Sequence, residues 1–322
     1  MRIAEGAVLA FDESLRFTDE IAPRRDPAGS GRDTVDCWKC LETEPFSRKG
    51  TMAKILVMTS GKGGVGKTTS TAALGAALAQ SGKSVVVVDF DVGLRNLDLV
   101  MGAERRVVFD FIHVIQGTVK LHQALIRDKR LETLSLLPAS LTHDKDVLTP
   151  DGVARVIDEL RQKFDWVICD SPAGIERGAM LAMRHAEVAV LVANAEVSSV
   201  RDCDRVIGLL NAKTEKAEKG EEIEKHLLIT RYDPTRAAKG EMLSVDDVLA
   251  ILAVPLIGVV PESQDVLRAS NLGTPVTVGC AGSAAARAYH DAMRRLTGEV
   301  VPMTIPSDST NLFGKLFRRN AA

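Results

Sequence analysis

The sequence predicts an α/β fold, a doubly wound and mainly parallel β-sheet with helices on both faces. Short, unbroken apolar runs such as VVVV at residues 85–88 alternate with longer helical segments. Continuous apolar strands are typical of parallel sheets that are buried on both faces. Several runs end at a glycine-rich loop or at an aspartate, which is where ligands bind in such sheets. With 322 residues and 45% apolar content, the chain can bury a substantial core.

The expected elements begin at Lys54. A strand over residues 55–58 leads through a glycine loop into an alanine-rich helix over residues 69–81. Further strands are expected at residues 85–88, 134–137, 166–169, 188–192, 226–230 and 256–260. Further helices are expected at residues 152–163 and from about residue 200 to residue 212. Residues 213–225 are mostly Lys, Glu and Gly, which predicts a solvated loop.

Residues 1–51 differ from the rest of the chain. They contain several prolines, scattered charge of both signs and no sustained apolar period, so we expect a poorly ordered extension. The apolar stretch Ala7–Ala10 is too short for a secretory signal, and the early acidic residues argue against a transit peptide. No apolar run approaches the roughly 18 residues of a membrane-spanning helix, which excludes an integral membrane protein.

The five cysteines and the net charge exclude further classes. Only Cys37 and Cys40 are close in sequence, and no second pair completes the four ligands of a zinc site. An odd cysteine count without a secretion signal predicts a reduced, cytosolic chain. A net charge of −2 argues against capture of nucleic acid by bulk charge.

The strongest motif is GKGGVGKT at residues 61–68. It fits the phosphate-loop pattern G-x-x-x-x-G-K-[ST], with a strand before it and a helix after it. The glycines let backbone N–H groups converge on phosphate oxygens, and this context disfavours a turn that binds nothing. Lys67 should reach the β- and γ-phosphates, and the Thr68 hydroxyl should help to hold Mg²⁺. The expected nucleotide contacts are Gly61, Lys62, Gly63, Gly64, Val65, Gly66, Lys67, Thr68 and Thr69.

Three aspartates follow predicted strands at the same edge of the sheet. Asp170 ends one strand and suits a contact with Mg²⁺, while Asp89 and Asp91 follow another strand and should flank the phosphates. A carboxylate there can orient the water that attacks the γ-phosphate. The alternative is that each aspartate merely caps the next element.

Lys62 is an additional lysine ahead of the usual Lys67. With it, the loop resembles the deviant Walker A loop of the MinD/ParA ATPases, in which the extra lysine reaches the phosphates of a dimer partner. Residues 89–98 and 169–176 resemble the switch segments of the septum-placing members of that family. Residues 196–202 resemble their dimer interface, and residues 230–232 their adenine-side strand end. The resemblance covers residues 52 to about 290. Ala195 departs from it, because the motif often has proline there.

The resemblance implies a deviant Walker A P-loop ATPase that uses ATP and Mg²⁺. Asp91 would position the hydrolytic water with support from Asp89, and Lys62 would act in trans beside the nucleotide's own Lys67. Arg231 and Pro261 would border the adenine. The positions implied to face partners are Arg95, Asn96, Glu104, Glu196, Ser198, Asp202 and Asp204.

The resemblance also implies partners and a cellular role. The partners are a second copy of the chain bound to ATP, a MinC-like division inhibitor and a MinE-like factor that stimulates hydrolysis. The protein would regulate placement of the division septum from the cytoplasm and the cytoplasmic face of the inner membrane. DNA-partitioning and flagellar-placement ATPases of the same family are the alternatives. A reductase like the nitrogenase iron protein would need cluster-binding cysteines, and Cys169 and Cys203 do not match that pattern.

The C-terminal segment predicts a basic amphipathic helix. On a helical projection Leu312, Phe313, Leu316 and Phe317 share an arc of about 140°. The basic residues on the other side are Lys315, Arg318 and Arg319. Such a helix suits an anionic bilayer surface, although docking on the domain or on another protein is the alternative. We therefore expect an ATPase domain at residues 52–300, a linker at 301–308 and a membrane-targeting tail at 309–322.

Overall fold

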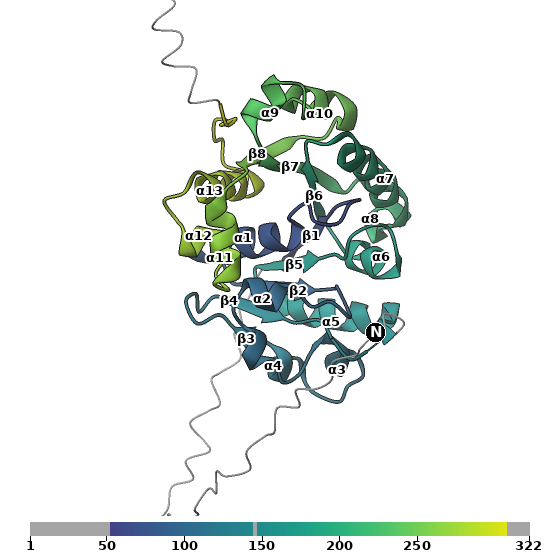
Figure 1. The fold of residues 1–322 in the computed structure, drawn as a ribbon. Coiled ribbons are helices and arrows are strands. Elements are labelled where there is room, and N and C mark those ends of the chain that lie inside the picture. Colours follow the sequence, from purple (N-terminus) through teal and green to yellow (C-terminus); the bar gives the residue numbers. More distant parts are fainter. Residues whose placement is uncertain (1–51, 144–146, 308–322) are drawn as a thin grey trace, which may run out of the picture. The chain divides into compact units, whose positions relative to one another are not determined.

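The computed structural model describes residues 52–143 and 147–307 (Figure 1). These residues lie in the second of the two units into which the chain divides, residues 46–322. The extension at residues 1–51 and the amphipathic tail at residues 309–322 lie outside the described residues. Within the described ranges, no helix has the length and apolar character needed to cross a bilayer.

The centre of the fold is an eight-stranded sheet in the order β3-β4-β2-β5-β1-β6-β7-β8. Its strands are β1 (Lys54–Thr59), β2 (Val85–Asp89), β3 (Ile126–Arg127), β4 (Leu134–Leu137), β5 (Trp166–Asp170), β6 (Val188–Asn194), β7 (Glu224–Tyr232) and β8 (Leu256–Pro261). Each neighbouring pair is parallel except β3 with β4, which is antiparallel. The chain winds in one direction from β1 to β2 and in the other from β5 to β6, so the predicted doubly wound fold is confirmed.

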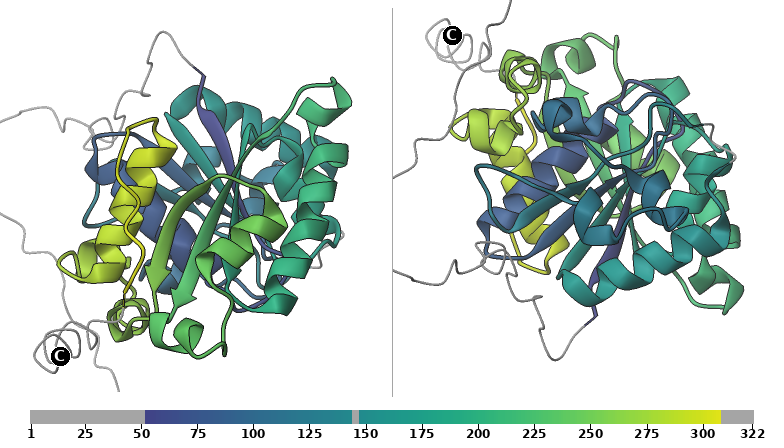
Figure 2. Two further views of the ribbon diagram at one scale, coloured as in Figure 1. Left: turned by 90° about the horizontal axis from the view of Figure 1, so that it is seen from above. Right: turned by 90° about the horizontal axis from the view of Figure 1, so that it is seen from below.

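Helices cover both faces of the sheet (Figure 2). On one face α1 packs with α12 and α13, and on the other α3, α5, α6, α7 and α10 contribute to a second core. The helices are α1 (Lys67–Gln80), α2 (Leu97–Val100), the 3₁₀ helix η2 (Glu104–Arg106), α3 (Phe111–Ile115), α4 (Leu121–Ala124), α5 (Pro150–Lys163), α6 (Arg177–Arg184), α7 (Val197–Lys213), α8 (Glu215–Glu218), α9 (Pro234–Ala238), α10 (Val245–Leu252), α11 (Gln264–Asn271), α12 (Val276–Gly279) and α13 (Ala284–Leu296).

Alternate residues of each central strand enter opposite cores, which explains the unbroken apolar runs. In β1, Ile55 and Val57 pack on one face, while Leu56 and Met58 pack on the other. All four side chains are fully buried. Because both faces need apolar side chains, the sequence shows no alternation between polar and apolar residues. This burial holds the carboxyl ends of the strands in one rigid edge.

One predicted loop is wrong. Residues 213–225 contain the end of α7, the short helix α8 and the start of β7. Thr214 is buried, its hydroxyl donates to the Leu210 carbonyl, and its oxygen accepts the N–H of Ala217 at the start of α8. The Arg184 guanidinium then pairs with Glu218. The prediction relied on the charged composition of the segment. Composition does not reveal an N-cap threonine, which depends on one residue at one position.

Two helical glycines give a matched test of how tightly α1 packs on the sheet. A Cβ added to Gly75 would lie 2.8 Å from Cγ1 of the buried Val87, whereas one added to Gly208 in α7 would meet no atom within 4 Å. Gly208→Ala should therefore stabilise the fold by about 0.5–1 kcal/mol. Gly75→Ala should lose that gain to overpacking, which costs about 1–3 kcal/mol. Urea unfolding of both variants checks the difference, and equal stabilisation by the two would contradict the packing argument.

Candidate functional site

The phosphate loop connects β1 to α1 at the carboxyl edge of the sheet. Gly64 and Gly66 have φ values of +76° and +96°, a backbone region that favours glycine. A Cβ on Gly61 would lie 2.3 Å from the backbone carbonyl oxygen of Asp202 in α7. The glycines therefore serve two purposes: they permit the turns of the loop, and they let its backbone pack directly on α7.

Lys67 folds back over this loop. Its ammonium group donates to the Ser60 hydroxyl at 2.9 Å, and that hydroxyl donates to the carbonyl of Lys62 at 2.8 Å. Lys67 is only 7% exposed. Burial lowers the pKa of Lys67, while nearby Asp170 and Asp91 act in the opposite direction. A buried cation on a glycine loop with converging N–H groups is suited to phosphate.

Two buried carboxyl groups lie side by side at the ends of β2 and β5, since Asp89 and Asp170 are register partners. Burial raises the pKa of Asp170 to about 6, although hydrogen bonds from Thr68 and Thr71 and the charge of Lys67 act against this rise. Burial and the neighbouring Asp170 raise the pKa of Asp89 to about 8. The raised pKa values mean that burial disfavours two charged carboxylates here, and a bound cation would favour their ionised forms.

The donor set at this point fits Mg²⁺. Thr68 supplies a hydroxyl oxygen and Asp170 a carboxylate, and these hard oxygen ligands are the kind that Mg²⁺ binds together with substrate phosphates. The Thr71 hydroxyl donates to Asp170 Oδ1 at 2.9 Å and so orients that carboxylate. Thr68 and Asp170, which were both predicted from the sequence to hold Mg²⁺, thus lie together. Thr71 was not predicted.

Asp89 holds the backbone of the following loop. Its Oδ1 accepts the N–H of Asp91 at 2.8 Å, and its Oδ2 accepts the N–H of Leu97 at 3.2 Å. Leu97 is the first residue of α2. The buried carboxyl group therefore fixes both ends of the segment that contains Asp91. The role of Asp89 is therefore to position Asp91.

A cavity of about 560 Å³ opens in front of the loop. Its volume is in the range of small-molecule sites. Its lining residues are Gly63, Gly64, Gly66, Lys67, Thr68, Thr69, Asp91, Leu94, Asn96, Leu99, Val100, Ser171, Ala173, Ser270 and Asn271. Sequence analysis identified the loop, Asp91 and Asn96 but missed the walls contributed by α2 and α11. Those walls carry no chemical motif, so nothing in the local sequence distinguishes them.

Arg231 and Pro261 are not among the residues that line the cavity. Arg231 has a φ of +54° and its guanidinium donates to the Gly64 carbonyl at 3.3 Å. The neighbouring Thr230 hydroxyl donates to the Val65 carbonyl at 2.6 Å. Pro261 ends β8 beside Tyr232. The end of β7 thus supports the backbone of the phosphate loop.

Lys62 lies on the outside of the loop. Its Nζ is 2.8 Å from Glu196 Oε2 and 3.0 Å from the Ser198 hydroxyl. The hydrogen bond and charge of Lys62 hold the pKa of Glu196 below its ordinary value. The Lys62 side chain is 38% exposed. Three residues that sequence analysis predicted for the dimer interface therefore contact one another within one chain.

The remaining predicted partner residues lie in the loop before α2, in η2 and in α7. Arg95 has a φ of +46°, and its Nε lies 2.8 Å from Oδ2 of the fully buried Asp98. Burial raises the pKa of Asp98, against the charge of Arg95. Glu104 is half-buried in η2, and Asp204 is exposed on α7. Asp98 was missed because its role depends on a pairing that only the folded loop creates.

Two of the described cysteines, Cys169 and Cys203, are unsuited to act as thiolates. Cys169 and Cys203 are buried in β5 and α7, and burial raises the pKa of their thiols to about 12 and about 11. A metal cluster binds thiolates, so this placement supports the sequence-based argument against an iron-protein type of site. The prediction for Cys37 and Cys40 lies outside the described residues.

Comparisons with known proteins agree with this geometry. The model of the CobQ/CobB/MinD/ParA nucleotide-binding domain matches residues 56–276. The septum site-determining protein MinD of Escherichia coli K12 is 56% identical over 269 residues, which cover 83% of this chain and 99% of that protein. MinD of Neisseria meningitidis is 56% identical over 270 residues, with the same coverage.

Solved structures extend the comparison. The MinD cell division protein of Aquifex aeolicus is 40% identical, covers 78% of this chain and all of its own, and superposes with a TM-score of 0.69. A MinD from Pyrococcus horikoshii solved with Mg-ADP is 30% identical, with a TM-score of 0.68, 77% coverage of this chain and 97% of that one. A family model over most of the chain and relatives at this identity establish the assignment. The chain belongs to the MinD family of cell-division ATPases.

Proposed function

We propose that the chain binds ATP and Mg²⁺ in the cavity in front of the phosphate loop, dimerises when ATP is bound, and regulates placement of the division septum. The observation that carries the proposal is the position of two lysines on one loop. Lys67 is buried over the loop, while Lys62 is partly exposed and pairs with Glu196 and Ser198. We assign Lys67 to the chain's own nucleotide and Lys62 to the nucleotide of a neighbouring subunit.

The chemistry follows from the residues around the cavity. Loop N–H groups and Lys67 would bind the phosphates, and Thr68 with Asp170 would hold Mg²⁺, an ion that would supply neutralisation of charge on the phosphate oxygens. Asp91 lines the cavity and orients the attacking water. Asp89 keeps Asp91 in place through the backbone hydrogen bond described above.

Release of Lys62 for a dimer partner costs little. Its ion pair with Glu196 joins side chains that are 38% and 41% exposed. Ion pairs between exposed groups contribute about 0–1 kcal/mol because water screens them. Phosphate oxygens of a bound nucleotide offer Lys62 a stronger, doubly charged partner. Lys62 therefore pairs with Glu196 and Ser198 in the single subunit and exchanges these partners for phosphate oxygens when the second subunit binds.

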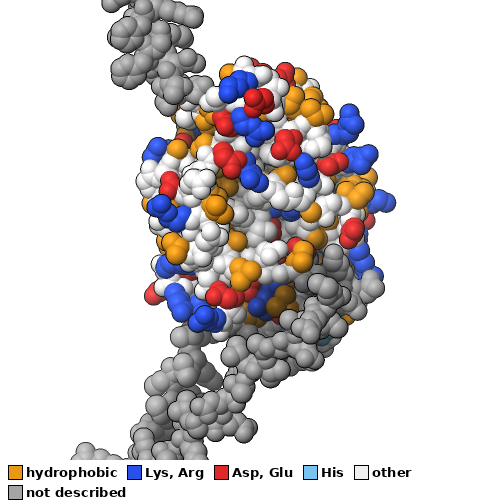
Figure 3. Space-filling view, in the orientation of Figure 1, with side chains coloured by type: hydrophobic (Ala, Val, Ile, Leu, Met, Phe, Trp, Pro, Cys, Tyr) orange, Lys and Arg blue, Asp and Glu red, His pale blue; other side chains and the backbone are white. Residues whose placement is uncertain are grey.

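The proposed partners follow from the relatives. A structure of a MinC:MinD cell division complex from Aquifex aeolicus is 40% identical in its matching chain, with a TM-score of 0.70 and coverage of 79% of this chain and 99% of that one. We propose a MinC-like inhibitor and a MinE-like activator for this chain, bound through the segments that include Arg95, Glu104 and Asp202. On the face shown in Figure 3 cationic and anionic side chains are mixed, which gives no support for binding DNA instead.

We propose that the protein works at the cytoplasmic face of the inner membrane, attached through its tail. Arg295 holds the start of the linker, because its guanidinium donates to the carbonyls of Ile257 at 2.7 Å, Val301 at 3.0 Å and also Pro302. The described chain is thus held against β8 as far as Pro302.

One tail should bind marginally. Burial contributes roughly 1.5–3 kcal/mol for each fully inserted apolar side chain, and ordering costs about 1 kcal/mol or more for each residue. Each basic residue adds about 1 kcal/mol near anionic lipid. Two tails in a dimer gain roughly 10²- to 10⁴-fold in avidity. Dimerisation by ATP would therefore control attachment.

Asp91→Asn should leave ATP binding intact and lower the hydrolysis rate by about 10²-fold or more, since a positioned carboxylate contributes roughly that much. Asp89→Asn is the matched control. The amide resembles the protonated carboxyl but accepts only one of the two backbone N–H groups, so stability should fall, and hydrolysis should fall less than in Asp91→Asn because Asp89 acts only through the position of Asp91. Single-turnover hydrolysis and nucleotide titration separate the two effects. Equal loss of hydrolysis in both variants would contradict the assignment of Asp91.

Lys62→Ala should retain nucleotide binding but lose ATP-dependent dimerisation and sedimentation with anionic vesicles. Lys67→Ala should lose nucleotide binding itself, because it removes the buried cation. Glu196→Ala frees Lys62 and tests whether the intrachain pair opposes dimerisation. Sedimentation equilibrium with ATP and with ADP provides the measurement. Normal dimerisation and vesicle binding by Lys62→Ala would refute the role of Lys62 in trans.

Deletion of residues 309–322 should spare ATP binding and dimerisation but abolish sedimentation with anionic vesicles. The full chain should sediment with ATP and remain in solution with ADP. Vesicles of neutral lipid serve as the control, because they remove the attraction of the basic residues. Unchanged sedimentation of the truncated chain would refute the tail as the membrane anchor.

A further inference from the structure

The two walls of the cavity come from distant parts of the sequence. Asn96, Leu99 and Val100 belong to the segment at α2, and Ser270 and Asn271 belong to the end of α11. Neither wall is part of the phosphate loop. Their spacing decides whether a nucleotide fits between them, so a residue that ties them together would act on nucleotide binding without touching the nucleotide.

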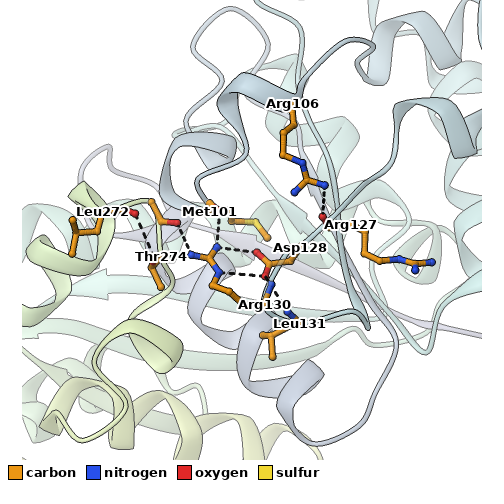
Figure 4. Close-up of polar contacts among 9 residues, drawn as sticks. Met101, Arg106, Arg127, Asp128, Arg130, Leu131, Leu272 and Thr274 are labelled. Atoms are coloured by element: carbon orange, nitrogen blue, oxygen red, sulfur yellow. Dashed lines mark hydrogen bonds and ion pairs between the residues drawn. The ribbon is translucent and has the colours of Figure 1, made fainter. Parts of the chain in front are cut away.

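Arg130 makes such a connection from the turn between β3 and β4 (Figure 4). Its Nη2 donates to the carbonyl of Met101 at the end of α2, at 2.7 Å. Its Nη1 donates to the carbonyl of Gly273 at 2.9 Å and to the Thr274 hydroxyl at 2.6 Å, just after α11. One guanidinium group therefore bridges the C-terminal ends of both walls.

Asp128 orients this guanidinium. It accepts hydrogen bonds from Arg130 Nη2 at 2.9 Å and Nε at 3.3 Å, in a bidentate pair. Its Oδ1 also accepts the backbone N–H groups of Arg130 and Leu131. The Asp128 side chain is only 4% exposed. Burial acts to raise the pKa of Asp128, but these hydrogen bonds and the charge of Arg130 hold it below its ordinary value. The ion pair with Asp128 thus fixes the orientation of the Arg130 guanidinium group.

The bridged segments also touch through their backbones. Gly102 and Gly273 have φ values of +64° and +59°. A Cβ on Gly102 would lie 2.5 Å from the Gly273 carbonyl oxygen, and one on Gly273 would lie 2.6 Å from the Gly102 Cα. No side chain separates the two walls at this point. The carbonyls that Arg130 binds belong to Gly273 and to the residue before Gly102, so the guanidinium secures this contact directly.

We propose that Arg130 is a positioning residue for the nucleotide, which holds α2 and the end of α11 at the spacing that the bound nucleotide requires. The inference rests on the proposed function, because it places the nucleotide in this cavity. Asp89 fixes the first residue of α2, and Arg130 fixes the residue that follows its last turn. Contacts on the γ-phosphate side of the cavity are thereby linked to its α11 side.

The test compares Arg130→Ala with Arg106→Ala. The Arg106 guanidinium donates to the Arg127 carbonyl at 2.7 Å on the same edge of the sheet, and no cavity wall is among its described hydrogen bonds (Figure 4). The readouts are the Kd for fluorescently labelled ADP with Mg²⁺ and the Tm with and without ADP. ADP is chosen so that turnover and ATP-dependent dimerisation do not enter the measurement.

Arg130→Ala should raise the Kd by about tenfold, which corresponds to about 1.4 kcal/mol, and should shrink the rise in Tm that ADP produces. Arg106→Ala should bind ADP like the unmodified chain. Arg130→Lys keeps the charge but loses the planar fork, and Thr274→Val removes one acceptor, so both should weaken binding by smaller factors. These two variants carry the same test if Arg130→Ala does not fold.

An unchanged Kd in the folded variants, with Tm lowered equally in the presence and absence of ADP, would overturn the proposal and leave Arg130 a purely structural role. Failure of the unmodified chain to bind ADP would instead refute the proposed nucleotide site. The two failures are therefore distinguishable in one titration series.

Discussion

The adjacent carboxyl groups of Asp89 and Asp170 constrain the whole site. Parallel pairing of β2 with β5 places them opposite each other in a fully buried position, where two negative charges are unfavourable. Hydrogen-bond donors and a cation around them reduce that cost, although the charge of Asp91 adds to it. Asp170 accepts from the Thr71 hydroxyl and faces the charge of Lys67, while Asp89 accepts from the backbone at Asp91 and Leu97. The groups that contact this buried carboxyl pair thus come from helix α1, the phosphate loop and the segment leading to α2.

The two lysines of the phosphate loop differ because their surroundings differ. Lys67 is buried, and its ammonium group is fixed by the Ser60 hydroxyl, so it is committed to the interior of the site. Lys62 is held by Glu196 and Ser198 in a partly exposed position, where an ion pair contributes little and exchanges easily. Lys67 is therefore suited to a permanent contact, and Lys62 is suited to an exchangeable one. This difference underlies the proposal that dimerisation reports on bound ATP.

Helix α2 is short, and its position depends on its two ends. At its start Leu97 is tied to Asp89, and beyond its end Met101 is tied to Arg130. Within the preceding loop Arg95 pairs with buried Asp98, which fixes a residue in the left-handed backbone region. A short helix contributes few hydrogen bonds of its own, so these charged contacts determine where it lies. Through these contacts the phosphate site is connected to the segment that carries Arg95.

The sequence by itself determined the chemistry of the loop and the strands of the sheet other than the short, antiparallel edge strand β3. The buried runs at β1, β2, β5 and β6 and the pattern around Lys67 are local signals, because burial on both faces and backbone approach to phosphate each demand particular residue types. Only the tertiary structure decided which segments form the walls of the cavity and how they are held. The contact of Gly102 with Gly273, and the fork of Arg130 between them, join residues that are far apart in sequence. No local pattern distinguishes Arg130, Gly102 or Gly273 in its own segment. Their roles depend on contacts with the opposite wall, which form only when the chain folds.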